Sequence, residues 1–243
     1  MSHLDLARAF RAAAPRPPET GAQGEKKNYA ERLSRQLAQA IADALRAQFT
    51  GILPTSKGGQ QESRARTAKG YKKLDVNYST VELGLGLGVS IKTLNFRDGK
   101  SARYTKNYTR IDNELRSEAT DYHVRQPFSV LVGVLFLPVD SADDGTENTP
   151  SSFGSAVQIF RQRAGRSLPA DYADRFERFF VALYDLADLL QGDEDFVDFF
   201  DVMNSPPKTR RPRTDECLRA DAFIEQIRLT YDARNNPPFE WAP

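Results

Sequence analysis

Side chains that commonly build metal and catalytic sites are scarce in this chain of 243 residues. It has one cysteine, Cys217, and two histidines, His3 and His123. A single cysteine excludes an internal disulfide bond and a zinc site built from the cysteines of one chain. Two histidines argue against a histidine-rich metal site and against a Ser-His-Asp triad. His123 lies near the end of an expected helix, where a structural or capping role is the simpler interpretation.

Long apolar runs are also missing. The longest, Phe128 to Leu137, lies between two prolines and is much shorter than the ~20 apolar residues that a membrane span requires. The N-terminus shows no apolar signal region. We therefore expect a cytoplasmic protein with no membrane association, and we interpret the run as a buried strand.

The chain has no large excess of either charge, since its formal net charge is +1. The overall charge therefore gives no signal for a nucleic-acid partner. The charges nevertheless occur in blocks, with acidic residues at 140–147 and 193–201. Basic residues flank the segment 74–96 on both sides: Lys57, Arg64, Arg66, Lys69, Lys72 and Lys73 before it, and Lys92, Arg97, Lys100, Arg103, Lys106 and Arg110 within or after it. That segment therefore has locally basic surroundings.

The segment 74–96 carries the strongest alternating pattern in the sequence. From residue 81 onward, one set of alternate positions is apolar: Val81, Leu83, Leu85, Leu87, Val89 and Ile91. The other set holds Glu82, Gly84, Gly86, Gly88, Ser90 and Lys92. Alternation over this length predicts a half-buried β-strand. Glycines in a strand often mark places where a ligand or another backbone comes close.

Two helices and two further strands are expected in the first 140 residues. Asn28 is a suitable cap for a helix over residues 29–49, whose apolar residues recur every four positions. A second helix is expected over 110–125, before Pro127, with Ile111, Leu115, Ala119 and Tyr122 on its inner face. A strand near 72–79 precedes the alternating segment, and the apolar run follows the second helix.

The two ends of the chain differ from this centre. A short helix over 4–14 and a linker rich in proline and glycine predict a flexible N-terminal segment over 1–27. Beyond the α/β core at 28–140, a phenylalanine-rich helix is expected over 171–190. A short turn over 196–203 and a last helix over 214–234 complete a helical C-terminal part, 141–243, packed on the core. Its phenylalanines are expected in the core or at a dimer surface.

The order helix, strand, strand, helix, strand, with an aspartate on one strand and a lysine on the next, resembles that of the restriction endonuclease-like, or PD-(D/E)XK, nuclease superfamily. Asp75 matches the aspartate of that family. Ser90-Ile91-Lys92 matches its acidic-x-Lys tripeptide except at the first position. The resemblance covers roughly residues 29–138 and implies an α/β fold, with a mixed β-sheet flanked by helices.

The resemblance also implies a function, namely an endonuclease of the restriction or phage-defence kind that uses Mg²⁺ or Mn²⁺ to hydrolyse DNA. Asp75 would hold the metal, Lys92 would assist the attacking water, and Ser90 would complete the site. Phosphodiester hydrolysis uses a divalent cation to stabilise charge and to lower the pKa of water, and Mg²⁺ takes one or two carboxylates from the protein. A homodimer is implied too, because cutting two strands commonly uses two sites.

The serine at position 90 is a departure from the family pattern, because a hydroxyl is a weaker metal ligand than a carboxylate. A second acid must then come from elsewhere. Glu82 would lie roughly 20 Å from Asp75 along an extended hairpin, so we discount it. Glu31 is the expected metal ligand, since first-helix glutamates supply an acid in some family members; Glu114 and Glu118 are further options. The alternative is a non-catalytic subunit that binds nucleic acid or protein.

Basic residues on either side of the strand are expected to contact phosphates, which Lys, Arg, Tyr, Thr and Asn side chains all bind. These are Lys69, Lys72, Arg97, Arg103 and Lys106. A solvated connection is the alternative for the stretch 97–106. The sequence also leaves open whether a partner protein keeps a toxic nuclease inactive.

Overall fold

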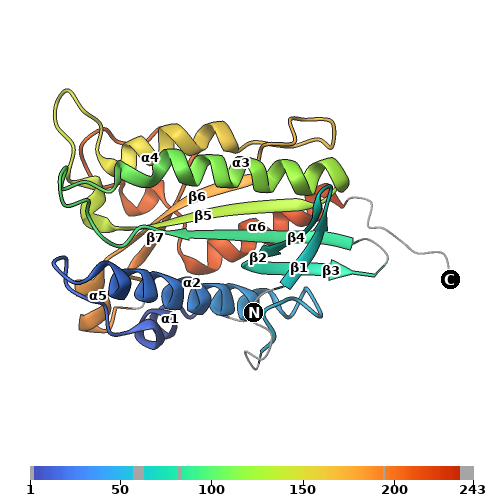
Figure 1. Cartoon of the computed structure of the whole chain (residues 1–243), viewed down its shortest axis with the longest axis horizontal. Helices are drawn as coiled ribbons and strands as arrows, with labels where there is room; N and C mark the ends of the chain where they lie inside the picture. Colours follow the sequence, from blue (N-terminus) through green and yellow to red (C-terminus); the bar gives the residue numbers. More distant parts are fainter. Residues whose placement is uncertain (1–2, 57–62, 82–83, 194, 236–243) are drawn as a thin grey trace.

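The computed structural model describes residues 3–56, 63–81, 84–193 and 195–235, and it has an α/β architecture with three layers (Figure 1). A five-stranded sheet forms the middle layer, with a separate two-stranded hairpin at one end. Helices α1 (Leu6–Ala13), α2 (Gln23–Leu45) and α6 (Ala220–Arg234) share one apolar cluster with the sheet. Helices α3 (Tyr108–Arg125) and α4 (Ser152–Phe160) share the other. The expected mixed sheet flanked by helices is therefore present.

The large sheet has the strand order β3-β4-β5-β6-β7. Its strands are β3 (Val76–Thr80), β4 (Gly84–Thr93), β5 (Val130–Pro138), β6 (Arg178–Tyr184) and β7 (Val197–Asp201). The three central strands are parallel, and each edge strand is antiparallel to its neighbour. Every residue of β5 up to Leu137 is buried, which confirms the prediction of a strand covered on both faces.

Strand β4 contains a bulge that changes which face its side chains occupy. Tyr78 of β3 pairs with Leu87, but Ser79 pairs with Leu85, which leaves Gly86 as an extra residue. One extra residue reverses the alternation, since side chains alternate with a period of two. Leu85 consequently joins the α3 cluster, whereas Leu87 lies in the α2 cluster. The expectation of one apolar face from residue 81 onward is wrong there, and Val81 itself is exposed.

The N-terminal region packs on the body of the protein. Asp5 caps α1 by accepting a hydrogen bond from the Arg8 backbone N–H, and Leu6 and Phe10 are buried in the α2 cluster. The segment 1–27, expected to be flexible, thus contains a packed helix. Helix α2 is the predicted first long helix, but it begins at Gln23 because Glu25 accepts from the Ala22 N–H and stabilises an earlier start.

The predicted helix over 171–190 is wrong, and with it the helical C-terminal part. Residues 178–184 form β6, and only Leu186–Gln191 is helical, as α5. Phe179 of β6 lies in the α3 cluster, and Phe180 lies in the α2 cluster. A strand buried on both faces is apolar at every position, so its sequence has no period that separates it from a buried helix. The expected turn over 196–203 is β7 for the same reason, whereas the last helix is confirmed as α6.

Hairpin strands β1 (Ser63–Thr67) and β2 (Gly70–Leu74) lie in the basic stretch before the segment 74–96, where the sequence predicted only a strand near 72–79. The phenylalanines that were expected in the core are buried: Phe176, Phe179, Phe180, Phe196, Phe199 and Phe200. Lys57, Glu82, Leu83, Phe239 and Trp241 lie outside the described residues. Within the described part of the chain, no helix has both the length and the apolar character needed to cross a membrane.

Candidate functional site

Asp75 lies at the junction between the hairpin and the large sheet. It follows β2 directly and precedes β3, and its Oδ2 accepts a hydrogen bond of 2.7 Å from the backbone N–H of Ile91. Since Val76 pairs with Val89, the register places Asp75 opposite Ser90. The aspartate and the Ser-Ile-Lys tripeptide are therefore neighbours across two antiparallel strands.

Ser90 and Lys92 point toward α3. Their neighbours Val89 and Ile91 belong to the α2 cluster, so the intervening residues of β4 occupy the opposite face. Ser90 is buried, and its hydroxyl donates a hydrogen bond to Oε1 of Glu118 on α3. The predicted inner face of α3, formed by Ile111, Leu115, Ala119 and Tyr122, is buried against the sheet. Glu118 lies beside that apolar face and so reaches the strand below.

Glu118 experiences an unusual electrostatic environment. The pKa of its carboxyl is raised to about 7 from an ordinary value of 4.5, chiefly by burial and in smaller part by the charges of Asp75 and Glu114. The charges of Lys92 and Lys72 offset only part of this rise. Two carboxyl groups, Asp75 and Glu118, thus lie close enough to interact within one site. A strongly shifted pKa beside a pocket is a recognised mark of functional sites.

Lys92 lies two residues beyond Ser90 on the same face of β4. Its ammonium is 3.4 Å from Oε2 of Glu114, which is one helical turn before Glu118. The other oxygen of Glu114 is 2.6 Å from Arg110. Lys92 is a quarter exposed, so its ammonium reaches both the carboxylates and the solvent. This position permits it to act on a water or phosphate at the mouth of the site.

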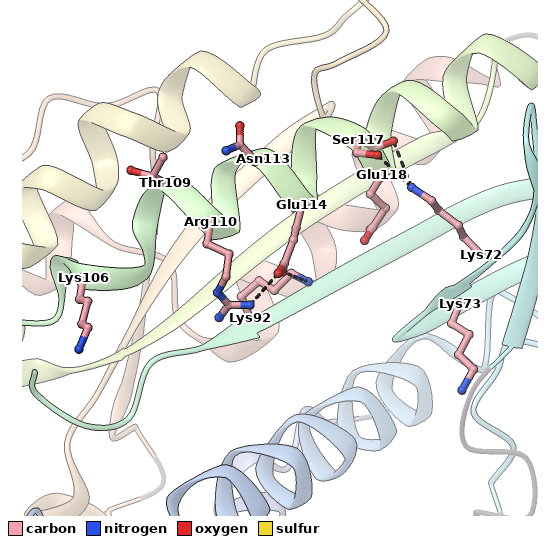
Figure 2. A pocket seen from close by; sticks show the side chains of 10 residues that line it. All are labelled: Lys72, Lys73, Lys92, Lys106, Thr109, Arg110, Asn113, Glu114, Ser117 and Glu118. Carbon is pink, nitrogen blue, oxygen red and sulfur yellow. Dashed lines mark hydrogen bonds and ion pairs between the residues drawn. The ribbon is translucent and has the colours of Figure 1, made fainter. Parts of the chain in front are cut away.

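A pocket of about 940 Å³ opens over these residues (Figure 2). Five cationic side chains and two carboxylates line it, together with three neutral polar residues: Lys72, Lys73, Lys92, Lys106, Arg110, Glu114, Glu118, Thr109, Asn113 and Ser117. Figure 2 shows Glu118 and Glu114 descending from α3 toward β4, with lysines on either side. The charge of this lining favours an anionic ligand with phosphate groups.

Two of the predicted phosphate ligands instead connect the hairpin to α3. The Nζ atoms of Lys69 and Lys72 lie 3.2 and 2.5 Å from the carboxylate of Asp121. Burial alone would raise the pKa of Asp121, but hydrogen bonds from the two lysines outweigh it and hold the pKa below its ordinary value. Lys72 also lines the pocket. Sequence reasoning missed Asp121, because nothing in its local pattern distinguishes it from other helical acids.

The other three predicted phosphate ligands lie around a second pocket of about 540 Å³, which shares Lys106 and Arg110 with the first. Arg97 binds Asp140 at 2.6 Å, Lys106 binds Asp98 at 2.7 Å, and Arg103 lies 3.7 Å from Asp144. Each cation is therefore paired with a carboxylate, and the stretch 97–106 is ordered by these contacts. The two pockets adjoin at Lys106 and Arg110, at the start of α3.

Glu31 is not brought to this group. It lies on α2, whose buried residues pack against the Val89 and Ile91 face of β4, opposite to Ser90 and Lys92. Its side chain is exposed and lies 3.7 Å from Lys27. The acid that reaches Ser90 comes from α3 instead. The spacing of Glu114 and Glu118 places both on one side of the helix that follows the strand, but it does not determine which face of β4 that helix covers.

The residues present suit a divalent cation in number and type. Among the described residues, no group of three or more His, Cys, Asp and Glu side chains could hold a metal ion. Mg²⁺ needs only one or two carboxylates and keeps water as its other ligands. Asp75 and Glu118, which both lie beside the Ser90-Ile91 stretch, could supply these two carboxylates.

His123 has the expected structural role, within a second buried group of charges. Its ring lies 3.5 Å from Glu177, which precedes β6, and its Nδ1 is 3.1 Å from the Ala173 carbonyl. Arg166 and Arg234 bind Glu177 at 2.7 and 2.9 Å. Both carboxylate oxygens of Glu177 accept hydrogen bonds, and the group joins α6 to the sheet.

Comparison of the chain with models of protein families, with curated proteins and with solved structures finds no match. The function must therefore be argued from the geometry of the site.

Proposed function

We propose that the protein is a divalent-metal-dependent endonuclease that hydrolyses phosphodiester bonds in DNA, with a restriction endonuclease-like arrangement of its core. The observation that carries this proposal is the meeting of Asp75, Ser90 and Glu118 beneath a basic pocket. The order α2, β3, β4, α3 and β5 agrees with the arrangement that the motif implies. Restriction or phage defence is the setting in which such an enzyme would act.

Asp75 and Glu118 would hold the cation, Mg²⁺ or Mn²⁺. When bound, the cation stabilises charge on the phosphate and lowers the pKa of water. The Ile91 backbone N–H orients Asp75, and the Ser90 hydroxyl orients Glu118, so neither carboxylate swings freely. Ser90 is thus a positioning residue, which explains how a hydroxyl can stand where the motif has an acid.

Lys92 would bind the scissile phosphate or the attacking water, since its ammonium is partly exposed at the pocket. Its ion pair with Glu114 must open or rearrange when phosphate binds. Phosphate is the stronger competitor at this position, because Arg110 remains to neutralise Glu114. Lys72 and Lys106, at either side, supply positive charge for the flanking phosphates.

Cleavage of supercoiled and linear DNA in Mg²⁺ or Mn²⁺ tests the proposal. Asp75→Asn, Glu118→Gln and Lys92→Ala should each lower the cleavage rate by at least about 100-fold, as loss of one electrostatic contact to a transition state commonly does. Glu31→Gln is the matched control, since it removes the same charge from an exposed glutamate, and it should cut as the wild type does.

The second candidate is a non-catalytic subunit that binds nucleic acid or protein. The ion pair of Lys92 with Glu114, and the serine in place of the motif acid, favour it. Wild-type protein that binds DNA but leaves it uncut in both metals, with binding unchanged in Asp75→Asn, would select this candidate.

A further inference from the structure

The β1–β2 hairpin has two faces of different character. Ala65, Thr67 and Leu74 are buried on the side toward α3. On the other side, the register pairs Arg64 with Lys73 and Arg66 with Tyr71. Arg64, Arg66, Tyr71 and Lys73 are all exposed, so one face of this ribbon carries three cations and an aromatic ring. Nothing in the proposed chemistry of the pocket uses Arg64, Arg66 or Tyr71.

The two arginines of this face differ from the other basic residues near the site. Lys69, Lys72, Arg97, Arg103 and Lys106 are each near a carboxylate. In the part of the chain that the structure describes, no ion pair joins Arg64 or Arg66 to an acid; the guanidinium of Arg66 lies 5.8 Å from the centre of the Tyr71 ring. Two exposed guanidinium groups that form no ion pair with any described acid are available to an anionic partner.

The hairpin is also held in a fixed orientation. The Ala68 backbone N–H donates a hydrogen bond of 2.9 Å to the Asp121 carbonyl, and the Asp121 side chain binds Lys69 and Lys72. Asp75 follows the last residue of β2 directly. A ligand on the exposed face is therefore adjacent to the site. Figure 1 shows the hairpin rising at one end of the sheet toward the end of α3.

We propose that the exposed face of this hairpin binds duplex DNA and places it across the site, which makes double-stranded DNA the substrate. The inference rests on the proposed function. The major groove of B-DNA admits a two-stranded β-ribbon, and arginine binds both phosphates and the guanine edge. Single-stranded DNA is bound by several aromatic side chains on which successive bases stack. The described exposed face of the ribbon offers one such ring, Tyr71, already covered by Arg66.

The test is a fluorescence-anisotropy titration of a labelled duplex of about 20 base pairs and of one of its strands, in EDTA, which prevents cleavage. Arg64→Ala with Arg66→Ala should weaken duplex binding about tenfold and reduce the slope of log K against log salt by about 2. Arg8→Ala with Arg11→Ala removes the same charge from exposed positions on α1 and should change neither. Circular dichroism checks that both variants fold.

Three outcomes would overturn the proposal. The control variant (Arg8→Ala with Arg11→Ala) could lose duplex affinity, or the hairpin variant (Arg64→Ala with Arg66→Ala) could keep the salt slope of the wild type. The hairpin variant could also lose more affinity for the single strand than for the duplex. Tyr71→Ala provides a further check. If its effect on single-strand binding exceeds the effect of the two arginine substitutions on duplex binding, the proposal is overturned. If only the nuclease proposal fails, duplex binding still depends on Arg64 and Arg66, but the wild type does not cut DNA in Mg²⁺ or Mn²⁺. If only the hairpin proposal fails, the variant with both arginines replaced binds and cuts DNA as the wild type does.

Discussion

Two glutamates are withdrawn from solvent against the sheet, and their surroundings differ in the supply of cations. Glu177 is bound by Arg166 and Arg234; its pKa lies below the ordinary value, because His123, the Leu131 N–H and Arg166 together outweigh the opposing effect of burial. Glu118 accepts from the Ser90 hydroxyl and has no cation within ion-pair distance among the described residues; burial raises its pKa to about 7, although the charges of Lys92 and Lys72 oppose this. The first arrangement satisfies a buried charge; the second leaves it unsatisfied beside an open pocket.

This contrast distinguishes an acid with a structural role from the acid that we propose for the active site. A buried charge with full pairing stabilises one conformation, because removal of either partner leaves the other uncompensated. A buried charge without pairing destabilises the free protein and favours the binding of a cation. Four measurements break or sharpen the contrast, and they follow in order of decreasing expected effect.

The largest effect is expected at Glu177. Glu177→Gln should destabilise the fold by about 3–5 kcal/mol, since it leaves two buried guanidinium groups without a counter-charge. Denaturant unfolding of the variant beside Glu118→Gln measures the difference. Equal losses in the two variants would remove the distinction between the sites.

The stability of the fold should depend on the protonation of Glu118. Its pKa is about 7 in the fold and 4.5 ordinarily, so between these values the folded chain holds a proton that the unfolded chain has released. The stability that this proton contributes is complete below pH ~4.5 and is lost as the pH rises through about 7. Glu118→Gln should therefore be more stable than the wild type at pH 8 by up to about 3 kcal/mol, since each unit of pKa shift corresponds to about 1.4 kcal/mol, and similar to it at pH 4.5.

Thermal melts of the two proteins across this pH range measure that effect as a difference, which cancels the contribution of other titrating groups. A difference that is constant with pH would contradict the assignment of the raised pKa to Glu118.

Magnesium should stabilise the wild type at pH 8 but not at pH 5.5, because Glu118 must lose its proton to bind the ion. At ten times the Kd the gain is about 1.4 kcal/mol. Asp75→Asn and Glu118→Gln should abolish this gain, whereas Glu177→Gln should retain it. A shift in Tm that survives in Asp75→Asn would place the ion elsewhere.

The smallest effect is expected at Asp121, which links Lys69 and Lys72 to α3. Asp121→Asn should lower global stability by about 1 kcal/mol or less, because one of the two lysines is largely exposed. Hydrogen exchange should quicken in residues 64–74 while the central strands keep their protection. Uniform protection in the hairpin would show that Asp121 does not hold it.

Much of the fold was predictable from local pattern. The 3.6-residue period marked α2, α3 and α6, and the apolar run between prolines marked β5. The pattern failed at β6, because a strand covered on both faces is apolar throughout. It failed again at Gly86, because one bulged residue turns Leu85 to the other side of the sheet.

The candidate site was predictable in part. The motif selected Asp75, Ser90 and Lys92, which the structure brings close to one another. The second acid was not determined by the motif, since the choice between Glu31 and Glu118 depends on which helix covers which face of β4. That is a property of tertiary packing, and no spacing along the chain contains it.

The position of the site along the chain has a genetic consequence. The groups proposed for the chemistry lie between Lys72 and Glu118, whereas the sheet is completed by β6 and β7, which end at Asp201. In a library of random substitutions scored separately for protein abundance and DNA damage, the two scores should diverge for changes in the first region. They should fall together for changes in the second.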